Sequence, residues 1–128
     1  IMFGISADKP DVLVVRKSKK IYKIVEKVDD ETFVAPYTKS VYKKDEDYSA
    51  QLETNRSRTA VKSGLYGITN KKAARKFLNK KHKFYNPNKV AIECLVPAGT
   101  NYYFNPHTKE VMVEHLTVNG EVDIRRKR

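Results

Sequence analysis

A single carboxylate interrupts the most apolar segment of the chain. Glu93 lies within residues 90–96, whose sequence is Val-Ala-Ile-Glu-Cys-Leu-Val. Strand alternation puts Glu93 on one face with Ala91 and Leu95, and Cys94 on the other. Because an isolated buried carboxylate is costly, we expect Glu93 to meet a cation or to line a cleft. The alternative is an edge-strand residue that faces solvent.

Cysteine and histidine give little sign of further chemistry. Cys94 is the only cysteine, so it cannot form an internal disulfide. We predict that it packs in the core, and a nucleophilic pair with His115 is the less favoured alternative. His82, His107 and His115 lack zinc-finger spacing, so the sequence predicts no structural metal site.

The positive charge is concentrated in one third of the chain. No acidic residue lies between Glu53 and Glu93, and the remaining fifteen basic residues equal the fifteen acidic ones, so this segment carries the whole net charge of +11. Such a field predicts an anionic partner: nucleic acid, nucleotide phosphates or an acidic protein. The alternative is a solvated surface that only aids solubility. The eleven basic residues are Arg56, Arg58, Lys62, Lys71, Lys72, Arg75, Lys76, Lys80, Lys81, Lys83 and Lys89.

The clearest predicted element is a basic helix over residues 70–82. Thr69 or Asn70 can cap its first turn, and Ala73, Ala74, Phe77 and Leu78 form a narrow apolar stripe. The other faces are cationic, and two lysines in the first turn oppose the helix dipole. We predict that this surface binds the partner through Lys71, Lys72, Arg75, Lys76, Lys80 and Lys81.

The remaining pattern is mainly that of strands, which gives an α+β fold of mostly antiparallel strands. We expect a short buried strand over 12–15, ending at Arg16, and a hairpin formed by 21–28 and 33–37. Residues 21–28 also fit helical spacing, and their β-branched side chains favour strand. Residues 39–62 should form a long connection with a helix around 46–55.

The C-terminal third predicts a series of strands and turns. Residues 90–96, 101–104 and 111–118 read as strands, and Asn119-Gly120 is typical of a type I′ hairpin turn leading into 121–124. A chain of 128 residues supports one compact domain, assigned to 1–124, with a basic tail at 125–128. The longest apolar run, 12–15, is far too short to cross a bilayer, so we expect a soluble cytoplasmic protein.

Three segments carry a resemblance to a known family. Residues 92–103 resemble the closing segment of mono-ADP-ribosyltransferases, in which a glutamate precedes a Pro-x-Gly-Thr turn and an aromatic strand. Residues 63–74 are similar to the strand-to-helix step of that superfamily, with Thr69 at its Ser/Thr motif. Residues 13–16 are similar to its first strand, which closes on an arginine. Ala91 departs from the family pattern, which has Glu or Gln there.

The resemblance implies a fold, a cofactor and three site residues. It implies an ADP-ribosyltransferase-like α+β fold and transfer of ADP-ribose from NAD to an acidic protein or a nucleic acid. Glu93 would be catalytic, hydrogen-bonding the ribose 2′-hydroxyl and stabilising the oxocarbenium ion. Arg16 would pair with phosphate, and Thr69 would support the strand geometry.

Two other interpretations accompany this one. The same stretch is more weakly similar to RNA 2′-phosphotransferases. Small members of the fold are common among phage and mobile-element proteins, which would place the chain in the host cytoplasm. The rival from another class is a non-catalytic module that docks nucleic acid or an acidic host protein through the basic segment, with Tyr66, Tyr85, Tyr102 or Tyr103 stacking on bases.

Overall fold

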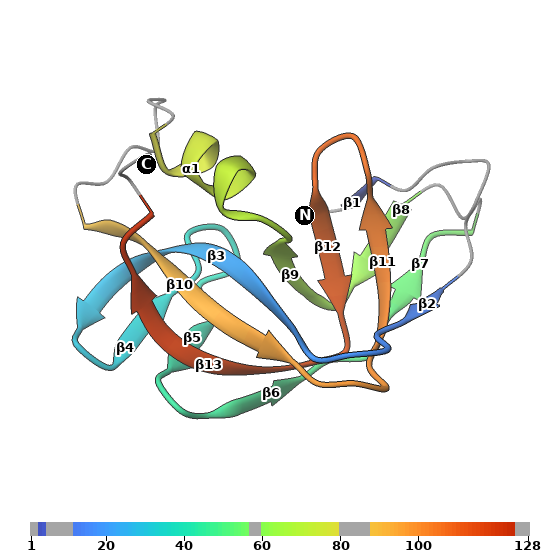
Figure 1. Cartoon of the computed structure of the whole chain (residues 1–128), viewed down its shortest axis with the longest axis horizontal. Coiled ribbons are helices and arrows are strands. Elements are labelled where there is room, and N and C mark those ends of the chain that lie inside the picture. Colours follow the sequence, from blue (N-terminus) through green and yellow to red (C-terminus); the bar gives the residue numbers. More distant parts are fainter. Residues whose placement is uncertain (1–2, 5–11, 57–59, 80–87, 125–128) are drawn as a thin grey trace.

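Figure 1 shows the computed structural model, which describes residues 3–4, 12–56, 60–79 and 88–124. Within this part of the chain, one helix, α1 (Lys71–Asn79), accompanies thirteen strands. The strands are β1 (Phe3–Gly4), β2 (Leu13–Val14), β3 (Lys19–Asp29), β4 (Thr32–Val34), β5 (Val41–Lys43), β6 (Asp47–Ser49), β7 (Glu53–Thr54), β8 (Ala60–Ser63), β9 (Leu65–Ile68), β10 (Lys89–Val96), β11 (Asn101–Asn105), β12 (Glu110–Val113) and β13 (His115–Val122).

Ten strands form one antiparallel sheet, and β3 connects its parts. The order is β2-β11-β12-β9-β3-β10-β13-β6, with β4 paired to β3 and β5 to β4, while β1, β8 and β7 form a second sheet. Along one edge, β3 pairs with β10 over eight residues. Along the other edge it pairs with β9 only at Tyr22 and with β4 from Glu26 onward. The two halves of the sheet therefore diverge beside β3, as Figure 1 shows.

Both faces of β3 are buried, each against a different group of residues. On one face Ile21 and Val25 join the larger core, which includes Phe33 and the interior side of β10. On the other face Tyr22 packs with Ala74 and Leu78 of α1. The strand is hydrophobic on both sides because the curled sheet covers one face and the helix covers the other.

The basic helix begins where the sequence predicts. The side-chain Oδ1 of Asn70 accepts a hydrogen bond from the backbone N–H of Ala73 at 2.8 Å, which confirms the predicted cap. Ala74 and Leu78 are buried, whereas Phe77 is 37% exposed. Residues 80–82 of the predicted helix lie outside the described residues. At nine residues α1 is too short to span a membrane, and no other helix occurs among the described residues.

Three other local predictions are confirmed. The hairpin forms from β3 and β4 with its turn at Asp30–Glu31, so the strand reading of residues 21–28 holds against the helical one. Residues 90–96 lie within β10, a central strand paired on both sides. Cys94 is fully buried in the larger core, as expected.

The predicted α+β ADP-ribosyltransferase-like fold class is wrong. The described chain is mostly antiparallel β-sheet with one short helix. The helix expected around residues 46–55 does not form, and this segment contains β6 and β7 instead. β6 pairs with β13, and Tyr48 packs against the larger core. Because these strands form through pairing with distant segments, the local sequence pattern does not predict them.

Asn119-Gly120 does not form the predicted hairpin turn. Both residues lie inside β13, opposite β10, where the register shifts between Glu93 and Cys94. Asn119 is the extra residue of a β-bulge, and Gly120 follows it with a φ of 125°. The strand predicted over 111–118 is also wrong, because it divides at Glu114 into β12 and β13, which join different halves of the sheet.

The prediction of a buried strand over residues 12–15 is also wrong. β2 is a two-residue strand at the end of the sheet order, and Val12, Leu13 and Val14 are each about half exposed. Only Val15 is buried. An end strand has one open edge, so an apolar run does not ensure burial there.

Candidate functional site

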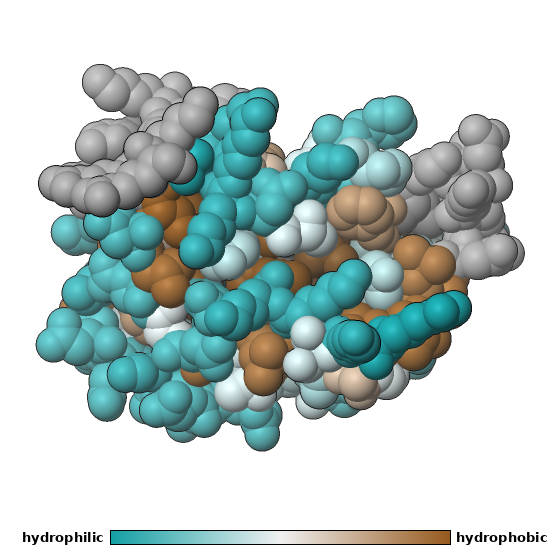
Figure 2. All heavy atoms as spheres, viewed as in Figure 1, coloured by the Kyte–Doolittle hydropathy of each residue, from teal (hydrophilic) through white to brown (hydrophobic). Residues whose placement is uncertain are grey.

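A hollow of about 300 Å³ opens where the two halves of the sheet diverge beside β3. Its walls are mainly aliphatic and aromatic side chains, and two lysines and a threonine complete its lining. Figure 2 shows apolar surface in the middle of this face, between hydrophilic side chains. The lining residues are Val15, Lys19, Lys20, Ile21, Thr69, Val96, Tyr102, Phe104, Val111 and Val113.

The register of β11 and β12 places four of these side chains together. Tyr102 pairs with Val113, and Phe104 pairs with Val111, so all four lie on the same face of the two strands. Val111 and Val113 are buried, whereas Tyr102 and Phe104 are partly exposed. The hollow thus has an aliphatic interior and two aromatic rings nearer solvent.

A glycine brings β9 close to β3 at the edge of the hollow. A Cβ atom added to Gly67 would lie 2.6 Å from Cδ1 of Ile21, which is closer than real Cβ contacts come. Gly67 therefore allows the close approach that joins the two halves at the Tyr22–Ile68 pair.

The lysines of the hollow are available to an anion. Lys19 is exposed and has no polar or ionic partner among the described residues. The side chain of Lys20 is 62% exposed, and its Nζ lies 3.6 Å from Oε1 of Glu93. Because the ammonium end of this contact is exposed to solvent and the separation is 3.6 Å, a bound anion can compete with Glu93 for Lys20.

The basic helix starts at the same hollow. Thr69, which lines it, directly precedes the capping residue Asn70. Lys71, Lys72 and Lys76 are exposed, and none of them has an acidic partner within the described ranges. We call these three lysines of α1, together with Lys19 and Lys20 of β3, the lysine face; of the five, only Lys19 and Lys20 line the hollow. Lys80 and Lys81, also predicted to bind a partner, lie outside the described residues.

Arg75 has a different role from the lysines of α1. It is half-buried, and its Nε donates a hydrogen bond of 2.6 Å to the backbone oxygen of Ile124. Arg75 therefore ties the helix to the chain beyond β13.

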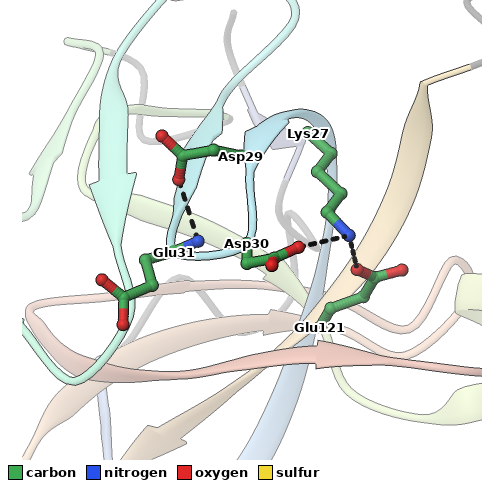
Figure 3. A network of polar contacts seen from close by, with 5 residues as sticks. All are labelled: Lys27, Asp29, Asp30, Glu31 and Glu121. Atoms are coloured by element: carbon green, nitrogen blue, oxygen red, sulfur yellow. Dashed lines mark hydrogen bonds and ion pairs between the residues drawn. The ribbon is translucent and has the colours of Figure 1, made fainter.

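At the opposite end of β3, acidic side chains neutralise the charge of Lys27. Nζ of Lys27 lies 2.8 Å from the carboxylate of Glu121 and 3.4 Å from that of Asp30, and Asp29 accepts a hydrogen bond from the backbone N–H of Glu31 (Figure 3). These hydrogen bonds with Glu121 and Asp30 raise the pKa of Lys27 above its ordinary value. The free positive charge of β3 thus lies at the end that borders the hollow.

The side chain of Glu93 contacts a cation, Lys20, as one of the two predictions from the sequence expects. Its side chain is 16% exposed, and its Oε1 accepts a hydrogen bond of 3.2 Å from Nδ2 of Asn119 in addition to the contact with Lys20. The alternative of a solvent-facing edge strand is wrong, because β10 is paired on both sides.

The hollow brings together only part of the predicted site. Thr69 lines it, and its Oγ1 donates a hydrogen bond of 2.9 Å to the backbone oxygen of Lys109. Neither Arg16 nor Glu93 is among the lining residues. Arg16 is exposed in the bend between β2 and β3 and makes no hydrogen bond or ion pair within the described chain.

A buried lysine was not predicted from the sequence. Lys23 is 5% exposed; its Nζ donates a hydrogen bond to the backbone oxygen of Tyr66 and lies 4.8 Å from the centroid of the Tyr42 ring. Burial lowers the pKa of Lys23 to about 8. Its position between Ile21 and Val25 on a predicted strand, with the same alternation, was the available signal.

Comparisons with known proteins add no assignment to this geometry. No family model, curated protein or solved structure matches the chain. Among the described residues there is also no group of three His, Cys, Asp or Glu side chains placed to hold a metal ion.

Proposed function

We propose that this chain is a non-catalytic binding protein for single-stranded nucleic acid, and that the lysine face contacts the phosphates. The observation that carries the proposal is a set of five exposed lysines on β3 and on the helix that starts beside the hollow: Lys19, Lys71, Lys72 and Lys76 lack an acidic partner within the described chain, and Lys20 has one partner, Glu93, at 3.6 Å. A net charge of +11 adds a long-range field that attracts a polyanion.

The aromatic lining favours nucleic acid over an acidic protein. Tyr102 and Phe104 lie at the hollow that the lysines border. Proteins that bind single strands combine a basic surface with aromatic side chains on which bases stack. An acidic protein surface would use the lysines alone.

The test is equilibrium binding of fluorescently labelled (dT)20 and (rU)20, measured by anisotropy over a range of salt concentrations. Counterion release predicts that affinity falls steeply with salt, by a log–log slope of about 0.7 for each phosphate contacted on a single strand. A variant with Lys71, Lys72 and Lys76 changed to Glu should bind much more weakly than the wild type.

A charge-matched control separates the lysine face from total charge. Lys39, Lys43 and Lys44 are exposed on the β4–β5–β6 side, and changing all three to Glu alters the net charge by the same amount. This control should retain most of the affinity. Equal losses in both variants, or failure of both polynucleotides to bind at low salt, would overturn the proposal, and binding of polyglutamate alone would assign the face to an acidic protein.

The transferase activity implied by the family resemblance remains a separate prediction. It rests on Glu93, Arg16 and Thr69 and on an NAD cofactor. It is tested below by NAD binding and by substitution of Glu93.

A further inference from the structure

We propose that the hollow holds one unstacked base of the bound single strand, with the adjoining phosphates against Lys19 and Lys20. This inference rests on the proposed function and adds a binding site to it. Its basis is that one small cavity combines an apolar interior, two aromatic side chains and an exposed cationic edge.

The size of the hollow suits a single base. Its volume of about 300 Å³ lies at the lower end of the range of about 300–1,000 Å³ found for small-molecule pockets. Its inner wall is closed by Val15, Ile21 and Val96, which are buried. Such a site accepts one compact, largely apolar group and leaves the rest of the polymer outside.

The aromatic residues provide the attraction for a base. Tyr102 and Phe104 stand two positions apart on β11, on the face that borders the hollow, while Tyr103 faces the opposite side and packs toward Val61 and Met112. Every base offers a flat π-face, so stacking on such rings tolerates any sequence. This arrangement predicts binding without strong sequence preference.

Polar groups in the hollow can form hydrogen bonds with the edge of a base. The hydroxyl of Tyr102 makes no hydrogen bond within the described residues, so it is free to donate or accept one. Thr69 Oγ1 donates to Lys109, and its lone pairs stay available to accept from a base N–H.

Charge complementarity determines the orientation of a nucleotide in the hollow. Lys19 and Lys20 are the exposed members of the lining, and Lys71 and Lys72 follow Thr69 by two and three residues at the start of α1. A purely apolar ligand would gain nothing from these cations. A nucleotide unit joins an apolar ring to an anionic phosphate, and so it matches both parts of the site.

The experiment compares (dT)8 with an octamer of abasic sites that has the same phosphodiester backbone. The wild type should bind (dT)8 about tenfold more tightly, which corresponds to about 1.4 kcal/mol. Phe104→Leu and Tyr102→Leu should remove most of this difference without weakening the binding of the abasic octamer. Tyr103→Leu, the matched control on the other face of β11, should keep the full difference.

A second measurement addresses variants that fold poorly. 2-Aminopurine placed in the octamer should change its fluorescence on binding to the wild type, because stacking quenches it, and this change should be lost in Phe104→Leu protein whose melting temperature is unaltered. Equal affinity of the wild type for (dT)8 and the abasic octamer would overturn the base site while leaving phosphate binding intact. Failure of the wild type to bind either octamer at low salt would overturn the proposed function itself.

Discussion

The ammonium group of Lys23 lies 4.8 Å from the centroid of the Tyr42 ring, inside the core enclosed by the curled sheet. The pair is a cation–π contact, and the hydrogen bond from Lys23 to the backbone oxygen of Tyr66 gives the charge a second partner. Burial still opposes the charged form and lowers the pKa of Lys23 from 10.5 to about 8. The buried charge therefore links folding to pH.

The first prediction concerns this linkage. Between pH 8 and 10.5 the unfolded chain holds more protons on Lys23 than the folded chain does, so the free energy of unfolding should rise with pH, by at most about 1.4 kcal/mol per pH unit. Burial raises the pKa of Cys94 from 9 to about 12, and this opposes the rise above pH 9. Urea unfolding from pH 7.5 to 9 should show the effect.

Two variants isolate the contribution of Lys23. Lys23→Met should lose the rise between pH 8 and 9, because no buried ammonium remains to titrate. Lys43→Met, which changes an exposed lysine of β5, should keep it. The same pH dependence in wild type and Lys23→Met would show that Lys23 is not the group responsible.

The second prediction separates two basic residues of α1. Arg75→Met should lower the free energy of unfolding by about 1–3 kcal/mol, because it removes a hydrogen bond from a charged group to the oxygen of Ile124. Lys76→Met, its exposed neighbour, should change stability by less than about 0.5 kcal/mol. Urea denaturation of the two variants measures the difference, and similar stabilities would contradict a tethering role for Arg75.

The third prediction concerns the close contact of β9 with β3. Gly67→Ala should destabilise the protein by about 1–3 kcal/mol, because the new methyl group overlaps Cδ1 of Ile21. Ile21→Val removes that atom and should by itself cost about 0.5–1.5 kcal/mol. The double variant should lose less than the sum of the two. A double-mutant cycle by thermal or urea unfolding measures this coupling, and strict additivity would contradict the contact.

The fourth prediction tests the transferase reading. For a non-catalytic protein, millimolar NAD should raise the melting temperature no more than AMP at the same concentration does, because a ligand stabilises the native state only through the contacts it makes there. Glu93→Gln should leave nucleic-acid binding within about twofold, since the ion pair of Glu93 with the exposed Lys20 is weak. Hydrolysis of NAD by the wild type that is abolished in Glu93→Gln would instead support the transferase.

The features that sequence reasoning predicted correctly depend on near neighbours in the chain. The cap at Asn70, the β3–β4 hairpin and β10 each follow from residues within one element or one turn. The errors arise where the structure of a segment depends on its pairing with residues that are distant in the sequence. The segment that contains β6 is strand because β13 lies beside it, and β2 is exposed because it ends the sheet.

The sequence also identifies only part of the candidate site. Thr69 and Tyr102 were named from the sequence, the first by resemblance and the second as an aromatic available for stacking. The sequence does not single out Lys19 and Lys20, because they lie outside the acid-free segment, where positive and negative charges balance in number. Balance in number does not ensure pairing in space, since two acidic residues contact Lys27 at the other end of β3 whereas Lys19 has no acidic partner within the described chain.

The bulge at Asn119 lets one strand serve two cores. Before it, Leu116 and Val118 point into the larger core; after it, Val122 and Ile124 pack beside α1, although all four positions are even-numbered. In an uninterrupted strand, residues of equal parity share one face. The extra residue therefore reverses the alternation of side chains within β13, so that residues of equal parity face opposite sides of the sheet before and after it. Deleting Asn119 would restore simple alternation and turn one set of apolar side chains to the wrong side of the sheet, so this exposed residue is less dispensable than its exposure suggests.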